Sequence, residues 1–362
     1  MPLILDAHQD LAFNMTVLGR DYCLPNAEIR LRDRQNGNDV YGGGSLLGLP
    51  EYNAGNVGLV FGTLFSAPER RVKQRTKSDE CYSTPTEAHR IYWNQLDFYH
   101  KLAETQSDAF RLVLTKQELK NHLDLWENQP DTQKPVGIIP LMEGAEGILD
   151  LDELPAWWER GLRIIGLAWA GNRFCGGTRE PGGLTDAGKD LIRAMAEVGF
   201  VLDLSHMDEP AALTCLELYP GRIIASHANA ARLVKGYNSN RLLSDDVIKK
   251  LIARGGVIGI SPYNAFLNAV WMEDGGKAAI SLRLVAEQID AICQMAGDVQ
   301  HVGIGTDFDG GIGVEMVPAE IDTIADLPLL FPFLKELGYD SNQIERIASG
   351  NFLEIIETTL PE

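Results

Sequence analysis

Histidine and carboxylate side chains follow short apolar segments at five places in this chain. The side chains are His8, Asp10, Glu143, His206, His227 and Asp307. Each apolar segment has the length and composition of a buried strand. Imidazole nitrogens and carboxylate oxygens bind zinc and similar divalent ions, and a carboxylate beside an activated water can carry its proton. The pattern therefore indicates metal-dependent hydrolysis.

The spacing of these residues favours two metal ions over one. His8 and Asp10 are two positions apart, so in extended backbone they point the same way and can reach one ion. His206 and His227 follow consecutive predicted strands and would lie side by side. Together with Glu143, these ligands exceed the three that a catalytic zinc ion usually takes from a protein. A carboxylate shared between two ions about 3.5–4 Å apart would account for the whole set.

Asp307 is the predicted proton carrier. It lies in the segment GTDFDG at residues 305–310, directly after an apolar run. A carboxylate in this place can take the proton of the attacking water and return it to a leaving amine. Asp309 is the alternative in the same segment, but Asp307 is nearer to the strand end. The predicted catalytic carboxylates are therefore Asp307 and Glu143.

Eight short apolar segments are predicted to be the strands that position these side chains. They are residues 3–6, 58–65, 136–141, 163–168, 200–204, 222–225, 256–260 and 301–305. Helical patterns alternate with them, for example at residues 84–105, 184–198 and 244–254. Strands that alternate with helices form a parallel sheet, and eight such units predict an α/β fold of the (β/α)8 TIM-barrel class. The dinuclear metal site is expected at the C-terminal strand ends, where such barrels carry their active sites.

Three segments exceed a minimal barrel. Residues 21–56 are rich in Gly, Asn and Arg and predict a long loop after the first strand. Residues 67–83 are polar and basic, and residues 109–127 predict an extra strand and helix before the third barrel strand. Because no linker or repeat interrupts the pattern, residues 1–362 are expected to form a single domain with these insertions.

Composition excludes several classes of partner. The chain has 362 residues and a formal net charge of -19, which disfavours nucleic acid and anionic membranes. No phosphate-binding loop motif is present. The five cysteines are scattered without a C-x-x-C pair, which is typical of a reducing compartment. The N-terminal residues lack the pattern of a signal peptide, and no apolar run has the length of a membrane span, so a cytoplasmic location is expected.

Six motifs together resemble the membrane dipeptidase (renal dipeptidase) family of dinuclear zinc peptidases, which is related to the amidohydrolase barrels. They are DAHQD at residues 6–10, MEG at 142–144, DLSH at 203–206, SHANA at 226–230, RLLSDD at 241–246 and GTDFDG at 305–310. They occur in the family's order and span nearly the whole chain. The set is specific to the family, although no single motif is.

This resemblance implies a metal-binding arrangement. His8 and Asp10 would hold one zinc ion, His206 and His227 would hold the other, and Glu143 would bridge the two. Other divalent metals remain open as alternatives to zinc. The family also implies a homodimer.

The resemblance further implies the reaction. A hydroxide shared by the two ions would attack the peptide bond of a small dipeptide, including dipeptides with a D-residue at the C-terminal side. Asp307 would act on that water. Arg241 matches an arginine that pairs with the free carboxylate of the substrate, which suits the bidentate geometry of a guanidinium group.

One position departs from the family's pattern. Mammalian members carry a substrate-binding histidine after the fourth strand, and this chain has Trp169 at that place. Tryptophan can donate a hydrogen bond only through its indole N–H. Asn172 and Arg173 lie close by in the sequence and are the predicted substitutes, so all three are candidate substrate-binding residues.

Two alternatives to a dipeptidase stay open. Another dinuclear metal hydrolase of the same scaffold could split N-acyl amino acids, lactams or lactones, because Arg241 would serve any substrate with a carboxylate. A non-catalytic metal-binding protein is the alternative from another class. Such a protein would have no need of Asp307 beside a complete set of metal ligands.

Overall fold

Eight parallel strands close into a barrel in the computed structural model of this protein, which describes residues 1–38, 42–72, 81–128 and 133–362. The strand order is β2-β1-β13-β12-β11-β10-β7-β6, and the pairing of β2 with β6 closes the ring. The barrel strands are β1 (Ile4–Gln9), β2 (Val57–Leu64), β6 (Val136–Glu143), β7 (Ile164–Gly166), β10 (Val201–Asp203), β11 (Ile223–Ala225), β12 (Val257–Ile260) and β13 (Val302–Ile304). The predicted (β/α)8 barrel is confirmed, and each of the eight predicted segments overlaps one of these strands.

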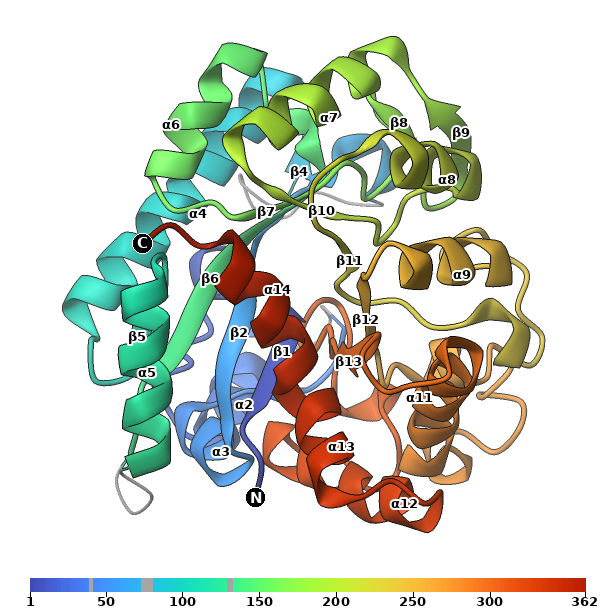
Figure 1. The fold of residues 1–362 in the computed structure, drawn as a ribbon. Coiled ribbons are helices and arrows are strands. Elements are labelled where there is room, and N and C mark those ends of the chain that lie inside the picture. Colours follow the sequence, from blue (N-terminus) through green and yellow to red (C-terminus); the bar gives the residue numbers. More distant parts are fainter. Residues whose placement is uncertain (39–41, 73–80, 129–132) are drawn as a thin grey trace.

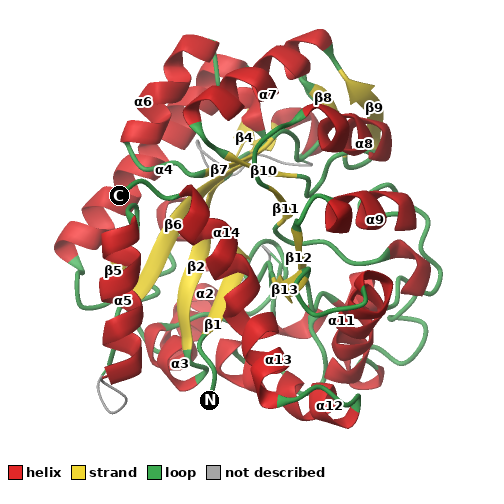
Figure 2. Ribbon diagram, viewed as in Figure 1, coloured by secondary structure: helices red, strands yellow, loops and turns green. Residues whose placement is uncertain are grey.

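Helices surround the barrel in Figure 1, and Figure 2 shows the strands enclosed by them. The α-helices are α1 (Leu11–Phe13), α2 (Asn26–Asn36), α3 (Leu49–Ala54), α4 (Pro85–Thr105), α5 (Lys116–Asn128), α6 (Leu154–Glu159), α7 (Asp186–Val198), α8 (Glu209–Leu218), α9 (Asp245–Ala253), α10 (Asn264–Leu267), α11 (Leu282–Ala296), α12 (Leu330–Glu336), α13 (Ser341–Glu345) and α14 (Asn351–Thr359). Side-chain caps set several of their starts. The Thr84 side chain accepts a hydrogen bond from the backbone N–H of Glu87, and Ser244 accepts one from Val247.

Apolar side chains fill the barrel interior below the strand ends. Leu5, Phe61, Leu141 and Ile224 belong to one buried cluster with Phe352 of α14. Helix α14 lies across the end of the barrel that faces the viewer in Figure 1 and closes it. Each fully buried side chain of this size contributes about 1.5–3 kcal/mol of transfer free energy. The opposite, C-terminal end of the barrel is left for polar residues.

The segment at residues 21–56 is more regular than the sequence predicts. Instead of one long loop, it contains helices α2 and α3. Helix α2 is highly charged and buries a narrow stripe that includes Ile29, so its amphipathic pattern is weak. Its C-terminal cap is Gly37 with a φ of 69°, in the left-handed region that suits glycine.

The other two insertions form short elements. The segment at residues 109–127 contains β5 (Phe110–Leu112), which pairs with β6, and most of α5, as predicted. Residues 67–83 include β3 (Ala67–Pro68) and β4 (Cys81–Tyr82), while residues 73–80 of this insertion lie outside the described part of the chain. A hairpin of β8 (Cys175–Gly177) and β9 (Glu180–Leu184) follows β7. Within the described residues, no helix combines the length and apolar character needed to cross a bilayer.

Candidate metal centre and substrate pocket

The C-terminal ends of five barrel strands bring the six candidate residues together. They are His8 in β1 and Asp10 just after it, Glu143 at the end of β6, His206 after β10, His227 after β11 and Asp307 after β13. All six are buried. Parallel strands of a barrel direct the residues that follow them to one face, which is why side chains so far apart in sequence meet here.

Glu143 lies at the centre of the three imidazole rings. Its Oε1 atom is 3.0 Å from Nε2 of His206 and 3.5 Å from Nε2 of both His8 and His227. The Nε2 atoms of His206 and His227 are 3.0 Å apart. A carboxylate in contact with ligands from three strands has the position that a shared metal ligand requires.

A second set of donors lies on the other side of His8. Its Nε2 atom is 3.9 Å from Oδ1 of Asp10 and 3.9 Å from Oδ1 of Asp307. The ligand atoms of His8, Asp10 and Asp307 lie within 4.8 Å of one another, as do those of His8, Glu143 and His227. The two groups share His8, so the donor atoms form one continuous cluster.

A serine or threonine hydroxyl group lies within hydrogen-bond distance of the Nδ1 atom of each imidazole ring. Nδ1 of His227 lies 2.9 Å and Nδ1 of His8 lies 3.3 Å from Oγ of Ser226. Because the Ser226 hydroxyl donates to Oδ2 of Asp203 at 2.5 Å, it accepts from the two Nδ1–H groups. Thr178 Oγ1 lies 2.9 Å from Nδ1 of His206. This arrangement directs the Nε2 atoms of His8 and His227 toward the cluster, which is the usual orientation of histidine ligands.

The unpaired atoms and charges of the cluster fit a metal centre. Among the described residues, Nε2 of His8 is buried without a hydrogen-bond partner. Burial and the charge of Glu143 raise the pKa of Asp10 to about 7. Burial opposes a charge on His8, but Glu143 and then Asp307 and Asp10 raise its pKa to about 10. Buried carboxylates that repel one another in this way are stabilised by divalent cations.

Burial lowers the pKa values of the other two histidines of the cluster and raises that of Asp307. It lowers the pKa of His206 to about 4, with a further contribution from the positive charge of Arg241. It also lowers the pKa of His227, so both rings are neutral and can act as ligands at pH 7. Burial and the nearby carboxylates raise the pKa of Asp307 well above its usual value. Asp307 therefore holds a proton more readily than an exposed aspartate does.

Backbone strain is concentrated at this face. His206 and Asp307 adopt φ angles of 67° and 58°, in the left-handed region that non-glycine residues rarely occupy. Each such residue costs on the order of 1–3 kcal/mol and persists where surrounding contacts determine it. The backbone N–H of Asp307 donates to the carbonyl of His8 at 3.2 Å. Strain of this kind clusters at functional sites, in agreement with the chemistry of the side chains.

The two aspartates of the GTDFDG segment have different surroundings. Asp309 accepts hydrogen bonds from the Tyr22 hydroxyl at 2.7 Å, the Ser45 hydroxyl at 2.6 Å and the Leu46 N–H at 2.8 Å. These bonds tie the loop after β1 to the loop after β13. Asp307 instead lines the central pocket, so the geometry favours Asp307 over Asp309 as the reacting carboxylate.

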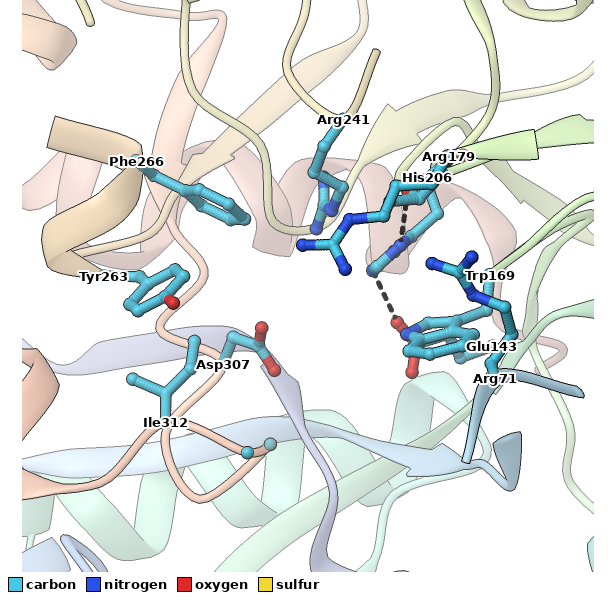
Figure 3. A pocket seen from close by; sticks show the side chains of 13 residues that line it. Arg71, Glu143, Trp169, Arg179, His206, Arg241, Tyr263, Phe266, Asp307 and Ile312 are labelled. Atoms are coloured by element: carbon cyan, nitrogen blue, oxygen red, sulfur yellow. Dashed lines mark hydrogen bonds and ion pairs between the residues drawn. The ribbon is translucent and has the colours of Figure 1, made fainter. Parts of the chain in front are cut away.

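A cavity of about 280 Å³ opens above the cluster (Figure 3). Glu143, His206 and Asp307 are among the residues that line it. The side chain of Arg241 points into it and is buried against the Phe266 ring, 5.0 Å from the ring centroid. Nη2 of Arg241 donates to the carbonyl of His227 at 2.9 Å, while Nη1 has no hydrogen-bond partner among the described residues. A buried guanidinium with a free donor is suited to bind a carboxylate.

Trp169 lines the cavity, as its predicted role requires, and its ring centroid is 6.0 Å from that of His206. The structure does not bring Asn172 and Arg173 into this cavity. Asn172 donates to the carbonyl of Leu167 at 2.7 Å and accepts from the N–H of Phe174 at 2.9 Å. Its amide thus closes the loop after β7 and is not available to a substrate.

Arg173 lies in the same loop as Asn172 and also outside the central cavity. Its guanidinium donates to the carbonyl of Ile148 and lies over the Phe174 ring, 4.5 Å from the centroid. Asn172 and Arg173 line a separate shallow hollow with Glu146. The prediction of substrate contacts for these two residues rested on their closeness to Trp169 in the sequence, whereas the Asn172 amide bonds to the backbone of its own loop.

Several residues of the site were not assigned a role from the sequence. Asp203 and Ser226 position the imidazoles. Each precedes a candidate ligand histidine within a predicted motif, so a polar residue shortly before a strand-end histidine is the signal that could have found them. Thr178, Arg71 and Arg179 also line the pocket. They come from insertions whose paths depend on tertiary contacts, and no sequence pattern points to them.

Solved structures with the same fold include peptidases. The dipeptidase AC, a metallopeptidase of family M19, matches with a TM-score of 0.76 and 23% identity over 100% of this chain and 99% of that one. A metallopeptidase from Rhodobacter sphaeroides, liganded with a phosphinate mimic of the dipeptide L-Ala-D-Ala, matches with a TM-score of 0.76 and 22% identity over 99% of each chain. At these identities the likeness establishes the fold.

Sequence comparison identifies the family. Relatives include an uncharacterized dipeptidase of Schizosaccharomyces pombe, 29% identical over 77% of this chain and 68% of that protein. The dipeptidase verJ of Clonostachys rogersoniana is 27% identical over 86% of this chain and 75% of that protein. The family model described as membrane dipeptidase (peptidase family M19) matches residues 2–360. The chain therefore belongs to the membrane dipeptidase family, peptidase family M19, and is a metallo-dipeptidase.

Proposed function

We propose that this metallo-dipeptidase uses two zinc ions to hydrolyse small dipeptides, including those with a D-residue at the C-terminal side. The observation that carries the proposal is the convergence of three imidazole Nε2 atoms on the Glu143 carboxylate, beside Asp10 and Asp307. Imidazole and carboxylate donors suit zinc, and other divalent ions bind the same donors.

In this proposal, His8 and Asp10 hold one ion, His206 and His227 hold the other, and Glu143 is shared. The chemistry that such a pair supplies when bound is polarisation of the scissile carbonyl and a water acidic enough to be the nucleophile near neutral pH. The hydroxyl of Ser226 contributes by fixing the orientation of two of the ligand rings. Loss of such supporting contacts typically weakens metal binding or activity by about 10- to 100-fold.

Asp307 moves the proton. Its carboxylate lines the cavity next to the metal ligands and takes a proton from the attacking water at one of its Oδ atoms. It then delivers that proton to the amine of the leaving residue as the C–N bond breaks. The raised pKa that burial gives to this carboxyl supports a group that holds the proton between the two steps.

Arg241 orients the substrate. Its free Nη1 donor binds the terminal carboxylate of the dipeptide, while Nη2 stays fixed to the carbonyl of His227. The small cavity sets an upper limit on the substrate, and Trp169 forms one wall. The complex of the Rhodobacter sphaeroides peptidase with its L-Ala-D-Ala mimic supports a dipeptide with a D-residue in second place.

The Arg241→Ala variant is expected to lose affinity mainly for substrates with a free carboxylate. A lost charge-assisted hydrogen-bond pair costs about 1.5–3 kcal/mol, and because the contact is present in both ground and transition states, KM rises while kcat changes little. The measurement compares a dipeptide with its C-terminal amide in both proteins. Equal losses on acid and amide would show that Arg241 has a structural role.

A substrate panel tests the function itself. Zinc-loaded protein is assayed with L-L and L-D dipeptides, N-acyl amino acids, lactams and lactones under the same conditions. The proposal predicts the highest kcat/KM for a dipeptide. A higher value for one of the other classes would favour another hydrolase of the same scaffold, and the absence of any turnover would favour a metal-binding protein without this activity.

The proposal also includes a homodimer and a cytoplasmic location. Light scattering coupled to size-exclusion chromatography tests the first, with a mass of two chains as the expected result. Fractionation of the source cells tests the second.

A further inference from the structure

Three arginines line the cavity above the metal ligands, and Arg241 accounts for one of them. The others are Arg71 and Arg179 (Figure 3). The chain as a whole is strongly acidic, with 51 Asp and Glu against 32 Lys and Arg. A concentration of guanidinium groups at one small cavity of such a protein indicates an anionic ligand with more than one charge.

Arg179 sits in the turn of the hairpin formed by β8 and β9. Gly177 pairs with Glu180, so Thr178 and Arg179 are the two turn residues. Arg179 has a φ of 59°, a conformation that glycine or asparagine adopts at lower cost. The presence of arginine at a strained turn position is explained if its side chain has a function.

The backbone of this turn is held at two points. The N–H of Arg179 donates to Oδ1 of Asn240 at 2.8 Å, and Nδ2 of Asn240 donates to the carbonyl of Gly177 at 3.0 Å. The preceding residue, Thr178, contacts the ring of His206. Asn240 immediately precedes Arg241. These contacts therefore fix the backbone of Arg179 relative to both His206 and Arg241.

The guanidinium of Arg179 is available to a ligand. It extends into the cavity in Figure 3, and no acidic side chain among the described residues forms an ion pair with it. The neighbouring arginines differ in this respect. Nη2 of Arg70 lies 2.7 Å and Nη1 of Arg71 lies 3.9 Å from the carboxylate of Glu180. Part of the Arg71 charge is thus already balanced, whereas that of Arg179 is not.

We propose that Arg179 binds a second carboxylate of the substrate, so that this enzyme prefers dipeptides ending in aspartate or glutamate. Arg241 would take the terminal carboxylate and Arg179 the side-chain carboxylate of the same residue. This inference rests on the proposed dipeptidase function. The planar donors of a guanidinium match a carboxylate, and two such groups in one cavity distinguish a residue with two carboxylates from its amide analogue, which has one.

The test compares acid and amide side chains of nearly equal size. The ratio of kcat/KM for Ala-Asp over Ala-Asn, and for Ala-Glu over Ala-Gln, is measured with metal-loaded protein for both configurations of the second residue. We expect a ratio of roughly tenfold or more in favour of the acid for the better configuration, about the value of one charge-assisted contact at a partly exposed site. The ratio is expected to decrease as salt is raised from about 0.05 to 0.5 M.

The Arg179→Asn variant removes the guanidinium but retains a residue type that adopts the left-handed turn. It is expected to reduce the acid-over-amide ratio to near one without lowering the melting temperature, and Arg179→Lys is expected to keep part of the ratio. Arg71→Gln is the matched control, because it removes one positive charge from the same cavity. It is expected to change the ratio less than Arg179→Asn does.

The outcomes separate the two levels of the proposal. If dipeptides are hydrolysed but Ala-Asp and Ala-Asn react equally well in the wild type, the preference for acidic residues is wrong and the dipeptidase function stands. Equal effects of Arg71→Gln and Arg179→Asn would attribute the preference to the general field of the cavity and overturn the role of Arg179. If no dipeptide is hydrolysed at all, the proposed function itself fails.

Discussion

The Asp307→Asn variant is expected to retain its metal ions and to lose about 100- to 10,000-fold in kcat. Asparagine has the shape of aspartate but accepts no proton at neutral pH, and general acid–base catalysis contributes a factor of this size. The raised pKa of the buried Asp307 carboxyl makes it the proton carrier in this account. Steady-state kinetics together with metal analysis of the purified variant is the measurement.

Asp309→Asn is the control for this experiment, because Asp309 lies two residues further along the same loop. Its carboxylate accepts bonds from Tyr22, Ser45 and the backbone of Leu46, so its replacement is expected to lower the melting temperature. Breaking such buried contacts costs about 1–3 kcal/mol each. Near-wild-type kcat for Asp307→Asn, with a large loss for Asp309→Asn, would transfer the catalytic role to Asp309.

The Glu143→Gln variant is expected to lose both metal and activity. Glu143 is the carboxylate closest to all three imidazoles, and glutamine in its place offers a neutral oxygen to the cations. The expected loss of kcat/KM exceeds about 100-fold, because removing a group that merely supports a ligand already costs 10- to 100-fold. Metal content after dialysis and kcat/KM at saturating zinc are measured side by side.

Glu146→Gln is the matched control for the shared ligand. Glu146 follows Glu143 by three residues but lies at the separate hollow that contains Asn172 and Arg173. This variant is expected to keep its metal. A Glu143→Gln protein that binds as much zinc as wild type would rule out Glu143 as a shared ligand, and equal metal loss in both variants would indicate a general effect of charge removal.

The clustering of the candidate metal-binding residues could be predicted because the apolar pattern of the sequence indicates where each strand ends. The apolar segments before His206 and His227 are short and bounded by polar residues, and a barrel directs whatever follows its strands to one face. Neighbouring parallel strands β10 and β11 then bring the two imidazoles together. Spacing alone predicted that these candidate ligands lie close together, and the distances in the structure agree with the proposed sharing of Glu143.

The pocket walls could not be predicted in the same way. The direction of the chain after Trp169 depends on hydrogen bonds between the Asn172 amide and the backbone, and these bonds hold Asn172 outside the central cavity. The turn that carries Arg179 is held by Asn240, which is 61 residues away in the sequence. Contacts of this range leave no periodic signal. Helix α2 was not predicted because its buried stripe is narrow and gives only a weak periodic pattern in the sequence.

Metal titration of the chelated protein tests the central claim most directly. Exhaustively chelated enzyme is expected to be inactive, and stepwise addition of zinc is expected to restore hydrolysis of the best dipeptide with saturation at about two equivalents per chain. Inductively coupled plasma mass spectrometry of the reactivated protein gives the bound stoichiometry independently. Saturation at one equivalent would contradict the shared-ligand arrangement around Glu143, and full activity of the metal-free protein would contradict the account as a whole.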